Sequence, residues 1–179
     1  MSSKATIDYS YHPEIPQWLA LGILKLAYDC VPFKFRRSAR VGFKYRVTQP
    51  HGHAQALIAK GASKRCSRDI EQTLHPPRTN KGEFRSYRHA CRWWLAWRIK
   101  ALVHEMTHIH DAQEGKPFNR RDRIPHDKRI QEIRAEDCAM TAFAYCMTHP
   151  VQRQRFNALA ERVSRMKDPH WSKTGATKK

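Results

Sequence analysis

The sequence predicts an α+β fold in a single domain. Several segments carry apolar residues at helical spacing, whereas one segment alternates apolar and polar residues as a strand does. With 179 residues the chain has the size of one ordinary domain and is long enough to bury a core. We expect this domain to cover residues 14–166, after a flexible N-terminal lead (1–13) and before a disordered basic tail (167–179).

The N-terminal half predicts one helix and one strand. Prolines at positions 13 and 16 introduce the apolar run 18–30, and Pro32 ends it, which is typical of a buried helix. The segment from Arg40 to Val47 places its apolar residues on one face, which indicates a strand. The remaining expected elements are a turn at 49–53, a short alanine-rich helix at 54–62 and a loop at 75–82.

The C-terminal half predicts three helices. The first two cover about residues 88–110 and 127–147, and a polar, basic connection separates them. Pro150 closes the second helix, and a basic amphipathic helix follows at 151–166.

The chain is strongly basic. It contains 34 Lys and Arg residues against 16 Asp and Glu residues, a formal net charge of +18. Such a charge attracts polyanions, so nucleic acid is an expected partner, and the alternative is a solvated basic surface without a dedicated partner.

Cysteine usage and hydropathy predict a cytoplasmic protein. The five cysteines are odd in number and form no C-x-x-C pair, which favours reduced thiols over a disulfide framework. The first ten residues are polar, and the longest apolar stretch, 18–28, is too short to span a bilayer. We therefore expect no membrane association.

One motif indicates a reaction class. His104-Glu105-Met106-Thr107-His108 has the pattern H-E-x-x-H. On a helix, two histidines four residues apart project from one face and can hold a single Zn²⁺. A glutamate next to the first histidine can act as general base on a metal-bound water. The alternative is a pair of histidines that serve packing or surface charge.

The residues before the motif suggest that this face is buried. Trp97, Ala101, His104 and His108 follow one another at helical spacing, so both histidines continue an apolar stripe. We expect this stripe, and the neighbouring tryptophans at 93 and 94, to anchor the helix against a sheet.

The helix at 127–147 contains the candidates for a third metal ligand. Glu132 and Glu136 lie on the same face as Ala135, Ala139, Phe143 and Cys146, where apolar residues are expected. A buried carboxylate is costly unless it is paired or bound to a metal. We therefore expect Glu132 to bind zinc and Glu136 to orient a ligand histidine, with the reverse assignment as the variant.

These two segments together resemble the gluzincin pattern of zinc metallopeptidases. The pattern H-E-x-x-H followed by E-x-x-A-x-x-x-A looks like small ImmA/IrrE-type and phage-borne members. The resemblance covers about residues 93–147, and Arg134 departs from it. It implies a zincin-like domain: an active-site helix, a ligand-bearing helix and a small sheet. It also implies a metallopeptidase acting on a protein or peptide, with His104, His108 and Glu132 as zinc ligands and Glu105 as general base.

Two alternatives remain. The segment that begins Pro125-His126-Asp127 is similar to the P-H-G segment of SprT-like proteases, which implies His126 as third ligand and proteins crosslinked to DNA as substrates. Asp127 departs from that pattern. The other alternative is a basic nucleic-acid-binding protein with a structural zinc or an accidental motif.

The sequence also leaves a second donor to the developing oxyanion open. His110, His126 and Tyr145 are the candidates. His110 lies two residues beyond His108 and therefore points from another helix face. We expect it to serve surface or loop packing rather than to bind the metal.

Overall fold

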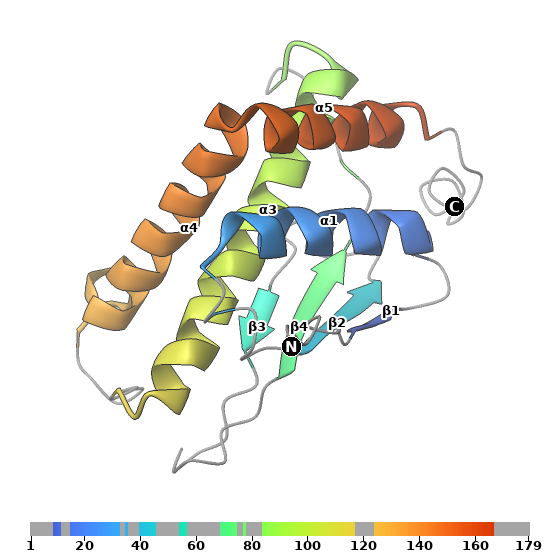
Figure 1. Ribbon diagram of the computed structural model, residues 1–179. Coiled ribbons are helices and arrows are strands. Elements are labelled where there is room, and N and C mark those ends of the chain that lie inside the picture. Colours follow the sequence, from blue (N-terminus) through green and yellow to red (C-terminus); the bar gives the residue numbers. More distant parts are fainter. Residues whose placement is uncertain are drawn as a thin grey trace, which may run out of the picture.

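The computed structural model describes residues 9–11, 15–32, 35, 40–45, 54–56, 69–74, 77, 84–116 and 124–166. Four α-helices dominate this part of the chain (Figure 1). They are α1 (Gln17–Cys30), α3 (Tyr87–Gln113), α4 (Ile130–Thr148) and α5 (Pro150–Ser164), and a 3₁₀ turn, η1 (His126–Lys128), precedes α4.

Four short strands lie on the side of α1 that faces away from α5 (Figure 1). They pair in the order β1-β2-β4-β3, with β1 and β4 parallel to β2 and β3 antiparallel to β4. None is longer than six residues; they are β1 (Tyr9–Tyr11), β2 (Arg40–Tyr45), β3 (Ala54–Ala56) and β4 (Asp69–Leu74).

The prediction of an α+β fold defined by a small sheet is wrong. Of the residues whose surroundings the structure describes, 80% are helical and 3% are in strands. The reason is that the helices bury their apolar faces mainly against one another, since α3 contacts α1, α4 and α5. Of the strands, only β4 contributes described core side chains, Ile70 and Leu74. The molecule is therefore mainly helical.

The individual helices agree well with the sequence patterns. The expected helices at 18–30, 88–110, 127–147 and 151–166 correspond to α1, α3, α4 and α5, with ends displaced by at most three residues. The N-terminal half is less accurate. The helix expected at 54–62 is wrong at its start, because β3 occupies 54–56, and β4 was not predicted. The N-terminal lead contains β1, and the tail at 167–179 lies outside the described residues.

One glycine lets α1 and α5 approach closely. A Cβ atom added at Gly22 would lie 2.8 Å from Cδ2 of Leu159, closer than side chains pack. This explains why a residue with low helix propensity occurs within an otherwise apolar helix. In the described part of the chain, no helix is long and apolar enough to cross a membrane.

The helix α5 is an integral part of the core. Its Phe156 is buried and packs edge-on against Phe143 of α4, with ring centroids 5.8 Å apart. The guanidinium of Arg92, on α3, lies 5.7 Å from the centre of the same ring. This one side chain therefore joins three helices.

We predict that Phe156→Ala lowers the free energy of unfolding by about 3–5 kcal/mol, because it leaves a cavity between α3, α4 and α5. Urea denaturation measures this change. The control is Val151→Ala on the same helix, which is exposed and should cost less than about 0.5 kcal/mol. Equal losses in both variants would contradict the packing of α5 on the core.

Candidate metal centre

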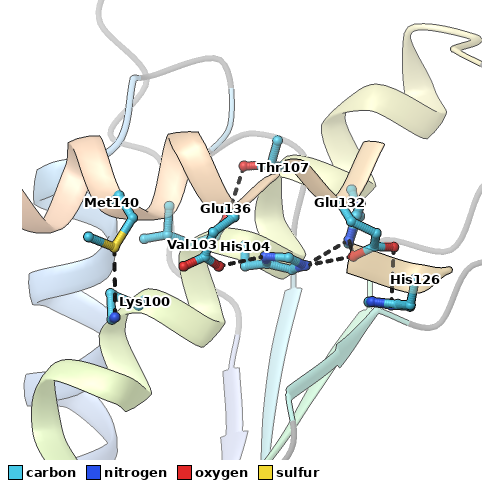
Figure 2. A network of polar contacts seen from close by, with 9 residues as sticks. Lys100, Val103, His104, Thr107, His126, Glu132, Glu136 and Met140 are labelled. Atoms are coloured by element: carbon cyan, nitrogen blue, oxygen red, sulfur yellow. Dashed lines mark hydrogen bonds and ion pairs between the residues drawn. The ribbon is translucent and has the colours of Figure 1, made fainter. Parts of the chain in front are cut away.

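The helices α3 and α4 bring together the three residues that the sequence nominates as metal ligands. The Nε2 atoms of His104 and His108 lie 3.1 and 3.2 Å from Oε2 of Glu132. The two Nε2 atoms are 3.0 Å apart. Figure 2 shows the side chains of His104 and Glu132 converging from the two helices. These three residues form a group that could hold a metal ion.

Local sequence explains this convergence. His104 and His108 are four residues apart on α3, so their rings are neighbours on one face, edge to face with centroids 4.6 Å apart. Glu132 lies in the first turn of α4, where the helix dipole stabilises a carboxylate. The next buried residues on α4, Ala135 and Ala139, are small, which allows the two helices to approach closely.

The chemistry of the three donor atoms fits a divalent cation. Ligand atoms bound about 2.0–2.2 Å from a tetrahedral ion lie about 3.3–3.6 Å from one another, close to the 3.0–3.2 Å observed here. Two imidazole nitrogens and a carboxylate oxygen that share one point direct their lone pairs at each other. A proton can relieve only one of these contacts, whereas a cation relieves all of them.

Burial prepares His108 for this role. The residue is buried, and its removal from water lowers the pKa of the imidazole below its ordinary value. The neighbouring His104 lowers that pKa further, while Glu132 opposes the shift. His108 is therefore neutral at pH 7, the state in which its ring nitrogen binds metals.

Glu136 approaches the other side of His104. Its Oε2 lies 3.6 Å from Nδ1 of His104, and its side chain is 57% exposed. In Figure 2 the ring of His104 lies between Glu136 and Glu132. The structure thus brings Glu132, and not Glu136, to the point where the two Nε2 atoms meet. A carboxylate at the remote nitrogen of a ligand histidine is a common outer contact of metal sites.

His126 lies beside the three-residue group and does not join it. Its Nε2 is 3.3 Å from Oε1 of Glu132, the carboxylate oxygen that faces away from His104 and His108. The side chain is 72% exposed on η1. The arrangement therefore favours Glu132 over His126 as the third donor.

The other residues named from the sequence are not part of the three-residue group. His110 is buried and packs on Phe35, with ring centroids 4.5 Å apart. Of the two roles expected for it, it therefore has the packing role and not the surface role. Glu105 is half-buried on α3, next to His104. Tyr145 lies 13 residues beyond Glu132 on α4, about 20 Å along the helix. It lines a separate pocket of about 540 Å³ between α1, α3 and α4.

A buried aspartate that the sequence analysis missed ties the end of α3 to α4. Asp111 accepts a hydrogen bond from Nζ of Lys116 at 3.1 Å and pairs with Nη2 of Arg134 at 3.2 Å. Arg134, which departs from the gluzincin pattern, therefore has a structural partner. Asp111 lies three residues after His108 on the same helix, and this spacing could have indicated that Asp111 lies close to the metal centre.

No family model, no curated protein and no solved structure matches this chain. The resemblance to gluzincins therefore stays an expectation that rests on the motif residues.

We predict that Glu136→Gln weakens divalent-metal affinity about tenfold to a hundredfold, because His104 loses the carboxylate at Nδ1. Competition with a chromophoric chelator, using Zn²⁺ as the probe, measures this affinity. The matched control is Asp137→Asn, which removes the same charge from the next residue of α4. A similar loss in both variants would show that only net charge matters and would contradict the contact with His104.

Proposed function

We propose that this protein is a zinc-dependent peptidase. The observation that carries the proposal is the convergence of His104 and His108, from α3, with Glu132, from α4, within 3.0–3.2 Å of one another. Glu105 directly follows His104 on α3. Three protein donors of this kind, two imidazoles and one carboxylate, are the set that catalytic zinc sites commonly use.

Zinc is the metal that this donor set favours. Two imidazole nitrogens with one carboxylate oxygen suit a borderline ion better than magnesium or calcium, which prefer oxygen ligands throughout. The partial burial of the group restricts water around it. The resemblance to gluzincins, carried by the same residues, supports the same metal.

The roles of the side chains follow from their chemistry. His104, His108 and Glu132 hold the ion, and Glu136 orients His104. When bound at such a site, zinc polarises a carbonyl and acidifies water. The carboxylate of Glu105 accepts the proton of the attacking water and then delivers it to the nitrogen of the leaving amine.

Two alternatives compete with this proposal. If the protein were SprT-like, His126 would be the third ligand, but the Nε2 atom of His126 contacts Oε1 of Glu132, the carboxylate oxygen that does not contact His104 or His108. In a nucleic-acid-binding protein with a structural zinc, the charge of +18 serves the main function and no peptide bond is cut. The proposed peptidase and the SprT-like protease differ in the third metal ligand. The nucleic-acid-binding protein differs from both because it cuts no peptide bond.

We predict that Glu105→Gln retains zinc and lowers peptide hydrolysis at least about a hundredfold, because the glutamine amide cannot accept the proton. The assay incubates zinc-loaded protein with a proteome-derived peptide mixture and identifies cleaved products by mass spectrometry. Glu114→Gln, an exposed carboxylate beyond the end of α3, is the control and should cleave as the wild type does.

Two results would count against the proposal. Undiminished hydrolysis by Glu105→Gln would remove the general-base assignment. A zinc-loaded wild type that cuts no peptide in the mixture would favour the structural-zinc alternative.

A further inference from the structure

A row of three aromatic side chains, two of them exposed, leads along α3 toward the metal centre. Trp93 and Trp97 are 56% and 44% exposed. Their rings are nearly parallel, with an interplanar angle of 6° and centroids 6.1 Å apart. Phe84, just before the helix, lies 5.6 Å from the ring of Trp93. We name Phe84, Trp93 and Trp97 the aromatic row.

This exposure corrects a sequence-based expectation. The stripe that continues to His104 and His108 was predicted to be buried, but of the three tryptophans only Trp94 is buried. The core of α3 instead uses another face, which carries Leu95, Ile99, Leu102 and Met106. Two adjacent indoles that are each about half exposed form an apolar patch, which is typical of interaction surfaces. They therefore indicate a surface that a partner covers.

Positive charge accompanies the aromatic row. The Nζ atom of Lys100 lies 5.5 Å above the ring of Trp97 and contacts Sδ of Met140 at 3.7 Å, as Figure 2 shows for the lysine and the methionine. Arg85 is exposed next to Phe84. Residues 84–103 contain five basic residues and no Asp or Glu. The charge of this surface is therefore complementary to an acidic partner.

Not every one of these cations is available to a partner. Arg88 pairs with Glu161, and Arg92 lies over the ring of Phe156. Arg98 is buried beside Trp94, and burial lowers its pKa to about 10. Arg85 is exposed next to Phe84, and the Nζ atom of Lys100 lies over the ring of Trp97, so these two cations flank the aromatic row itself. Flat aromatic surfaces between two cations match a partner with planar groups joined by anionic links.

We propose that the aromatic row binds single-stranded nucleic acid. Unpaired bases would stack on Trp93 and Trp97, and the flanking phosphates would contact Lys100 and Arg85. A duplex keeps its bases stacked on each other, so it offers these rings no free base face. The net charge of +18 adds a long-range attraction that any polyanion shares. The stacking selects the single strand.

The aromatic row also fixes where a bound strand would run. Trp97 precedes His104 by seven residues, two helical turns, so both lie on one face of α3 about 10 Å apart along its axis. A strand on the row therefore comes close to the metal centre. The binding does not depend on the proposed peptidase activity, and its test needs no substrate.

The experiment measures binding of fluorescein-labelled oligo(dT) of 20 nucleotides to the full chain by fluorescence anisotropy over a series of salt concentrations. Trp93→Ala combined with Trp97→Ala should weaken binding at least about tenfold but keep the salt dependence, because no charge changes. Replacing both residues by Tyr should restore most of the affinity. Tyr145→Ala is the matched control, since Tyr145 is 44% exposed on α4, and its affinity should stay within about twofold of the wild type.

Several results would overturn the proposal. Wild-type affinity in the double alanine variant would show that the rings do not stack on bases. Equal binding of a duplex, or of polyglutamate, would show attraction by charge alone. A dimer that the double alanine variant turns into a monomer would identify the aromatic row as a contact between two copies of the chain.

Discussion

The close packing of α4 on α3 is the constraint on which the site depends. It places the carboxylate of Glu132, buried at 6% exposure, against the imidazoles of His104 and His108. A buried carboxylate and two imidazole nitrogens are stable at one point only if a proton or a cation lies among them. The small side chains of Ala135 and Ala139 make this approach possible. The geometry of the site is therefore a consequence of helix packing and not of a flexible loop.

The long helix α3 separates stability from function by its faces. One face carries Leu95, Ile99, Leu102, Met106 and Ile109 into the core. Another carries Trp93, Trp97, His104 and His108, of which the tryptophans are exposed and the histidines meet Glu132. Substitutions on the first face should act through folding. Substitutions of Trp93 and Trp97 should act mainly through binding, whereas those of His104 and His108 should act through metal binding and, with it, stability.

Much of this arrangement could be predicted from the sequence. The four helices follow from apolar spacing and from prolines at their ends, and the meeting of His104, His108 and Glu132 follows from the H-E-x-x-H spacing and the cost of burying a carboxylate. The fold class could not be predicted, because the alternation at 40–47 indicates a strand but does not show how much of the core the strands contribute. The exposure of Trp97 could not be predicted either. Periodicity shows that one face of a helix is apolar. It does not show whether the chain's own core or a partner molecule covers that face. Segments such as 54–56 are too short for their pattern to separate strand from helix.

The most direct test of the central claim is the metal content of the purified protein, measured by elemental analysis for the wild type, Glu132→Ala and His126→Ala side by side. We predict about one zinc per chain in the wild type, loss of the zinc in Glu132→Ala and its retention in His126→Ala. Retention in Glu132→Ala with loss in His126→Ala would contradict the assignment of the third ligand. A wild-type protein that takes up no zinc after reconstitution would contradict the metal centre itself.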